Sequence, residues 1–382
     1  MSATCDTAAG RVIRFLGFSC ENANPIITLR NPADLENWTL PVLEVTIVVG
    51  AVLALVHAVR RLRRDHDPTN LALWAGSVVY LFVIEPPLYF PGWFGLENSV
   101  GFMFSHNVFT VQFMFDRLPL YIVAFYPALS TVAYEVVRSL GVFADRGPLA
   151  GSVCVAFVYE AFYEVFDQLG PQLKWWAWNP DNPANHPFLA SVPVNSIWIF
   201  ASVSFGVLTY SVTRLVGKPT WNGEAPRGWS LVWRTVVSGA LAPVGMVVAS
   251  IPTAIFGRKD ANVSAQAVVL AVEIVVLWLI GATLLVRQWR RNRRAETTAA
   301  SAGRGWFLRL FPAAYLIVLG ILWLSALPDV AGATHGVTKL GTPTGNLPYV
   351  VACFVVAGLS LAATLGSAGR ASAGKAPTSH DA

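Results

Sequence analysis

Apolar runs of about 20 residues recur along the whole chain, which is the length of a helix that crosses the hydrocarbon core of a bilayer. Lipid offers no hydrogen-bond partners to a backbone, and the alternating polar and apolar pattern of barrel strands is absent, so the runs must be helices. We therefore predict an all-α polytopic transmembrane bundle of about nine spans. They are residues 39–59, 70–90, 118–138, 148–169, 192–214, 229–252, 262–286, 306–327 and 347–366.

Composition agrees with this pattern. Hydrophobic residues make up 54% of the chain and charged residues only 13%, which excludes a soluble protein with a water-facing surface. We expect a multi-pass protein of the cell (plasma) membrane whose main partner is the lipid bilayer. The basic pI of about 9.1 fits loops that face anionic lipid headgroups, and no nucleic-acid-binding motif accompanies it.

The positions of Lys and Arg predict the orientation. Most of the 27 basic residues lie at span ends and in loops that share one side of the membrane if the N-terminus is outside and the C-terminus inside. We then expect an extracytoplasmic arm at 1–38, without the features of a cleaved signal peptide, and a disordered cytoplasmic tail at 367–382. Cys5 and Cys20 in the arm could form a disulfide or remain two free thiols.

The two parts of the membrane region differ in chemistry. Residues 39–214 should form a five-helix core that carries most of the acids, whereas residues 215–366 should form a plainer four-helix region. Two long loops, 91–117 and 170–191, are predicted to lie on the same outer face. Prolines interrupt the second loop, so we expect a rigid irregular cap there.

The span at 148–169 contains three acids. Glu160, Glu164 and Asp167 fall on one side of a helix and form a stripe about two turns long. An ionised carboxylate near the bilayer centre costs about 2.5–3.5 kcal/mol, so such residues face a protein interior or an aqueous cavity. We predict that this stripe is the functional site, and that its carboxyl groups cannot all be ionised at once.

Other polar residues lie at the same predicted depth. Glu85 precedes two prolines that should end or bend its helix, Glu44 lies in the first span, and Asn195 begins the fifth. Glu135 and Arg138 should form a structural pair.

Both aromatic loops supply candidate substrate-binding residues. Trp and Tyr commonly form belts at the membrane interface, and Asn and Asp commonly form turns, so a purely structural role is the alternative. The candidates are His106, Asn107, Trp176, Trp178, Asn179, Asp181 and His186, together with Asn195.

Three alternatives for the acids remain open. They could pair with buried cations or with tyrosines such as Tyr159 and Tyr163, or they could form the proton relay of a transporter. A metal site is disfavoured because Glu160, Glu164, His106 and His186 match no common ligand spacing, so we predict no metal.

The order of these features resembles the AveC-like spirocyclase family of actinobacterial membrane proteins, over about residues 70–200. The similar pieces are Glu85-Pro86, Ser105-His106-Asn107, Glu160 with Glu164, and Leu169-Gly170 leading to Trp178-Asn179-Pro180. The chain departs from the pattern where Glu160 replaces an Asp and where further helices follow at the C-terminus.

The resemblance implies a cofactor-free, acid-catalysed cyclisation of a lipophilic polyketide-like or isoprenoid-like substrate. Such a reaction needs a proton donor and a proton acceptor beside the reacting carbon. Glu164 and Asp167 would take these roles, and Glu85 and Glu160 would tune them. The proton-coupled transporter and a structural membrane protein without catalysis are the rival predictions.

Overall fold

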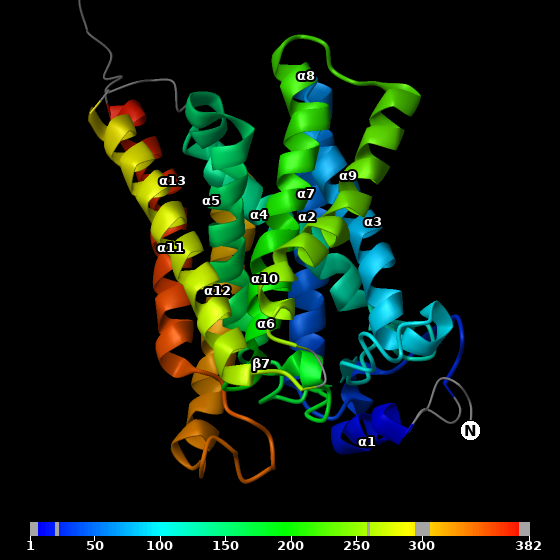
Figure 1. Cartoon of the computed structure of the whole chain (residues 1–382). Coiled ribbons are helices and arrows are strands. Elements are labelled where there is room, and N and C mark those ends of the chain that lie inside the picture. The colour runs from blue at the N-terminus through cyan, green and yellow to red at the C-terminus, as the bar shows by residue number, and fades with distance from the viewer. Residues whose placement is uncertain (1–6, 20–22, 258–259, 295–305, 374–382) are drawn as a thin grey trace, which may run out of the picture.

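The computed structural model describes residues 7–19, 23–257, 260–294 and 306–373, and side chains only as far as residue 364. Within these residues, nine helices are long and apolar enough to cross a membrane, so the predicted all-α bundle is confirmed (Figure 1). The bounds are α2 (Thr39–Asp65), α3 (Thr69–Tyr89), α4 (Leu120–Ser139), α5 (Val142–Asp167), a fifth span from Val194 to Trp221, α9 (Gly228–Ala249) continued by α10 (Ile251–Ala254), α11 (Val263–Arg294), α12 (Trp306–Ala331) and α13 (Leu347–Ala373).

The fifth span is not one uniform helix. It contains two π-helical turns, η4 and η5, which alternate with α-helical segments. Extra residues in a π-turn shift the side chains that follow it, and such turns are frequent at functional sites. The segments are α6 (Val194–Trp198), η4 (Ile199–Val203), α7 (Ser204–Val212), η5 (Thr213–Gly217) and α8 (Lys218–Trp221).

One end of the bundle, which we call the loop face, carries α1 (Thr7–Leu16), the short strands and the long loops. Antiparallel pairing of β2 with β5 joins the loops at 91–117 and 170–191, which confirms that they share a face. The second loop is more ordered than the predicted cap, because β5 and a further hairpin interrupt it. The strands are β1 (Ile27–Leu29), β2 (Phe104–His106), β3 (Val111–Phe113), β4 (Leu118–Pro119), β5 (Trp176–Trp178), β6 (Phe188–Leu189) and β7 (Val192–Pro193), with 3-10 turns η1 (Pro32–Asp34), η2 (Pro91–Phe94) and η3 (Pro183–Asn185).

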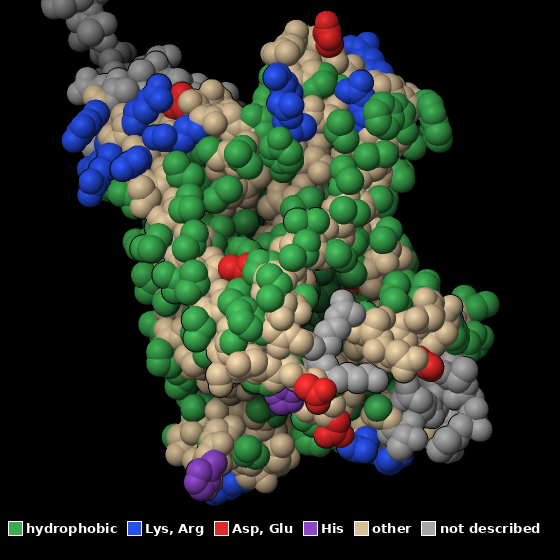
Figure 2. All heavy atoms as spheres, in the orientation of Figure 1, with side chains coloured by type: hydrophobic (Ala, Val, Ile, Leu, Met, Phe, Trp, Pro, Cys, Tyr) green, Lys and Arg blue, Asp and Glu red, His purple; other side chains and the backbone are tan. Residues whose placement is uncertain are grey.

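The opposite end, the basic face, gathers most of the visible Lys and Arg side chains (Figure 2). Helix ends there run past the apolar segments, as where α11 continues to Arg294. Which face lies in the cytoplasm stays a prediction. Helix α13 also continues past Gly366, into the predicted tail, and Cys5 and Cys20 lie outside the described residues.

Helices α4 and α5 form the interior of the bundle. Their membrane-spanning windows are 89% and 78% buried, whereas that of α11 is 22% buried and presents most of its surface to lipid. The acids of α5 therefore lie in a protein interior.

Glu44 of α2 connects the first outer loop to the bundle. It accepts hydrogen bonds from the backbone amides of Thr110 and Val111, at 3.0 and 3.2 Å.

The approach of α3 to α9 depends on glycine. A Cβ at Gly239 would lie 2.5 Å from the carbonyl oxygen of Gly76 and 2.8 Å from the Val79 side chain. We expect Gly239→Val to lower the free energy of unfolding by about 1–3 kcal/mol, because a backbone oxygen cannot move aside as a side chain can. Denaturant titration in mixed micelles would measure this. Gly320→Ala on α12, where a Cβ meets nothing within 4 Å, should be neutral or slightly stabilising, and equal losses in both variants would contradict the packing argument.

Candidate active site

A cavity lies between the helices at the loop-face end of the bundle. Its volume of about 40 Å³ corresponds to about three water molecules, so it admits a small group or one end of a larger molecule. Helices α3, α4, α5 and α6, η4 and the β2–β5 pair all contribute to its wall. The lining residues are Glu85, Phe104, His106, Ile122, Phe125, Tyr126, Tyr163, Phe166, Asp167, Trp176, Trp178, Ser196 and Phe200.

The wall of this cavity includes two carboxyl groups from different helices. Glu85 lies one turn before the end of α3, and its Oε1 accepts a hydrogen bond from the Tyr126 hydroxyl at 2.5 Å. Asp167 is the last residue of α5 and is 2% exposed. Glu85 Oε2 and Asp167 Oδ2 are buried and make no hydrogen bond within the described chain. The structure thus brings together a pair of acids, each with an oxygen that makes no geometrically defined hydrogen bond among the described residues.

His106 lines the same cavity from β2. Its Nδ1 lies 3.0 Å from the Tyr121 hydroxyl, and its ring meets Trp176 edge-on across the strand pair. Burial lowers the pKa of His106 from 6.5 to about 3, so the imidazole is neutral at physiological pH. Neither ring nitrogen contributes a positive charge to the cavity.

Glu160, the first acid of the stripe, does not line the cavity. Ser202 donates to its Oε2 at 2.7 Å, while Trp278 and Tyr349 donate to its Oε1 at 2.6 and 2.7 Å. These donors come from η4, α11 and α13, so the carboxyl group of Glu160 joins three elements to α5.

Glu164 lies between Glu160 and Asp167 on the stripe. Its Oε2 accepts a 3.2 Å hydrogen bond from Gln168, and its Oε1 is buried without a partner among the described residues. None of Glu85, Glu160, Glu164 and Asp167 forms an ion pair within the described chain, and all four are buried. Pairing with cations does not account for these acids, and Tyr349, not Tyr159 or Tyr163, bonds to Glu160.

Of the predicted loop residues, His106, Trp176 and Trp178 line the cavity. Asn107 and Asn179 donate to the backbone oxygens of Lys174 and Phe102, at 2.8 and 2.9 Å, and so tie the two loops together.

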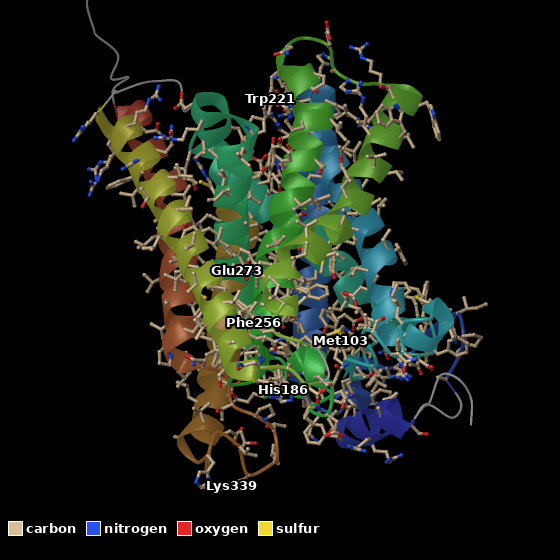
Figure 3. All side chains as sticks on the ribbon, in the orientation of Figure 1. Met103, His186, Trp221, Phe256, Glu273 and Lys339 are labelled. Carbon is tan, nitrogen blue, oxygen red and sulfur yellow. The ribbon has the colours of Figure 1, made fainter. Side chains whose placement is uncertain are left out.

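The remaining predicted polar residues lie outside the wall. Asp181 pairs with Arg11 of α1 at the surface, and His186 Nε2 lies 2.9 Å from the Pro180 carbonyl oxygen. Figure 3 shows His186 at the loop face. Asn195 precedes the lining residue Ser196, and its buried Oδ1 makes no hydrogen bond in the described structure.

Sequence comparison assigns the chain to a family. Residues 2–328 match the family model described as "Domain of unknown function (DUF7802)". The chain belongs to this family. No curated protein and no solved structure matches the chain. The matched range includes every residue that lines the cavity and ends before α13, which carries Tyr349.

Several lining residues are absent from the sequence-based candidates. Tyr126 and Phe125 lie in an apolar span in which no sequence pattern separates lining residues from packing residues. Phe200 belongs to a π-turn that could not be predicted from the sequence. Within the described chain, no group of three or more His, Cys, Asp or Glu side chains is arranged to hold a metal ion.

The neutral state of His106 predicts a pH-dependent stability. Because the unfolded chain takes up this proton near pH 6.5 and the folded chain only near pH 3, stability present above pH 6.5 is lost as the pH falls towards 3. Relative to His106→Gln, the wild-type protein should lose about 2 kcal/mol of unfolding free energy between pH 7 and pH 5. Unfolding curves of both proteins at each pH would measure the difference, and parallel curves would contradict a buried neutral histidine.

Proposed function

We propose that this membrane protein is a cofactor-free acid/base cyclase that acts on a lipophilic, polyketide-like or isoprenoid-like substrate in the plasma membrane. The observation that supports this proposal is the shared cavity of Glu85 and Asp167, which is walled by aromatic rings. A carboxyl pair inside an apolar pocket is suited to donate one proton and accept another.

The proposed step adds a substrate hydroxyl to a carbonyl carbon. Glu85, whose Oε1 is held by Tyr126, accepts the hydroxyl proton at Oε2 while the new C–O bond forms. Asp167 donates a proton to the carbonyl oxygen, whose π-electron pair becomes the new O–H bond. The product is a cyclic hemiketal. Protonation and loss of its hydroxyl as water would give an oxocarbenium ion, which forms an enol ether by losing a proton, or a ketal by adding a second hydroxyl of the substrate and releasing that hydroxyl's proton. This pair replaces the donor Glu164 and acceptor Asp167 expected from the sequence, because Glu85 and Asp167 are the acids among the residues that line the cavity.

The resemblance of residues 70–200 to the AveC-like spirocyclases agrees with this reaction class. The motif residues Glu85 and His106 lie in the cavity wall, and Leu169-Gly170 leads into β5. The family relationship itself stays a prediction.

Reaction without an ion gradient tests the proposal. Lipophilic extract from a deletion strain of the source organism would be incubated with leaky membranes that contain the protein, and its components followed by liquid chromatography and mass spectrometry. We expect one component to be replaced by an isomer of equal mass, or by a product that has lost one water. Conversion that needs sealed vesicles, or no conversion, would refute a cyclase.

A proton-coupled transporter is the second candidate. It is favoured by Glu164 Oε1, which is buried, has no hydrogen-bond partner in the described part of the chain, and could pass a proton along the stripe between Glu160 and Asp167. Uptake into sealed vesicles that collapses with the proton gradient, without any change in the mass or retention of the compound, would support this function.

A further inference from the structure

Two buried acids line the cavity, and no Lys or Arg is among the described residues of its wall. We propose that it binds a small organic cation, such as the protonated amine at one end of a lipophilic molecule. This inference rests on the cavity that the proposed function uses, but not on the cyclisation.

The first argument is the state of the two acids. Glu85 is 4% exposed and Asp167 is 2% exposed, and each has one oxygen without a hydrogen bond in the described chain. No Lys or Arg is among the residues that line the cavity, and neither acid forms an ion pair with a described residue. A buried carboxylate without a counter-charge is costly, so a bound cation would compensate the two oxygens that make no hydrogen bond among the described residues.

The second argument is the aromatic wall. Eight of the thirteen lining residues are Phe, Tyr or Trp. Their rings come from α4, α5, η4 and both strands of the β2–β5 pair, so they surround the space. The face of an aromatic ring attracts an ammonium group, and cages of this kind recognise alkylated amines. A purely apolar ligand would not need two acids, and a free metal cation would not need the rings.

The volume of the cavity and the route into it restrict the class of ligand further. The space of about 40 Å³ holds a primary or small secondary ammonium, and the remainder of the ligand must lie outside. Phe200, one of the lining residues, is only half-buried. On the face shown in Figure 2, hydrophobic side chains cover most of the middle of the bundle. An apolar tail could therefore remain in contact with lipid while the charged end enters.

Benzylamine and benzyl alcohol provide a matched pair of probes, because they have similar shape and differ in charge at pH 7.5. Isothermal titration calorimetry of the full-length protein in detergent micelles would measure both. We expect benzylammonium to bind at least about tenfold more tightly than benzyl alcohol. Equal binding of the two probes would overturn the proposal.

Variants assign the preference to this cavity. Asp167→Asn and Glu85→Gln should each reduce the preference for the cation, whereas Glu273→Gln, on α11 outside the cavity wall, should retain it (Figure 3). Thermal unfolding of each variant would verify its fold. A preference that persists in both acid variants would show that the amine binds elsewhere.

The outcomes separate this inference from the proposed function. Binding of benzylammonium without any cyclised product would support the cation site and refute the cyclase. Cyclised product without a preference for benzylammonium would support the cyclase and refute the cation site.

Discussion

Asp167→Asn is expected to lower the rate of product formation by about 10²–10⁴-fold, which is what a positioned general acid or base contributes. The amide has nearly the same volume as the acid, so the packing at the end of α5 should persist. It cannot exchange a proton with the substrate, and the chemical step loses its donor. Initial rates in leaky membranes, normalised to folded protein, would measure the effect.

Two other variants make this result specific. Glu273→Gln, an equivalent change outside the cavity, should leave the rate unchanged. Glu164→Gln should lower it far less than Asp167→Asn, because Glu164 does not line the cavity. If Glu164→Gln abolished the reaction and Asp167→Asn did not, the catalytic pair would be the one predicted from the sequence alone.

The membrane architecture could be predicted because apolar length is a local property. Each predicted span overlaps a helix of the structure over most of its length. The ends were less predictable. Helix α2 continues through a basic segment to Asp65. Arg61 in this segment pairs with Asp65 in the last turn and with Asp67 just after the helix, and these ion pairs compensate its charge.

The site could be predicted only in part, because contacts between helices leave no local pattern. The depth of the acids indicated that Glu85 and Asp167 could meet. The sequence could not show that Trp278 of α11 and Tyr349 of α13 donate hydrogen bonds to Glu160, which does not line the cavity, or that Tyr126 donates one to Glu85. Pairing of β2 with β5 also joins residues far apart in the chain, and it brings His106 and Trp176 to the cavity together.

His57 illustrates the same limit at the basic face. A histidine at the basic end of a helix is typical of the membrane interface, yet His57 is 5% exposed and stacks on Phe307 of α12 at 5.2 Å between ring centroids. Its Nε2 lies 3.3 Å from Glu135 Oε2, so tertiary contacts and not its position along the helix determine its surroundings.

Glu135→Gln is expected to lower the free energy of unfolding by about 3–5 kcal/mol, the cost of breaking a buried ion pair. Glu135 is fully buried and accepts from Arg138 Nε and Nη2 at 2.7 and 2.6 Å, and from Asn70 at 2.9 Å. The predicted pair with Arg138 is thus confirmed, within a larger cluster that joins α2, α3 and α4. An amide would leave the guanidinium of Arg138, whose side chain is only 16% exposed, without its counter-charge. Denaturant titration in mixed micelles would measure the loss.

A double-mutant cycle separates the charge from the packing. Arg138→Gln alone should also destabilise the protein, because it leaves Glu135 buried without its main partner. The double variant should lose less than the sum of the two single losses, because neither charge then remains uncompensated. A loss below about 1 kcal/mol for Glu135→Gln would match a solvent-exposed pair, and would mean that water reaches this cluster from the basic face.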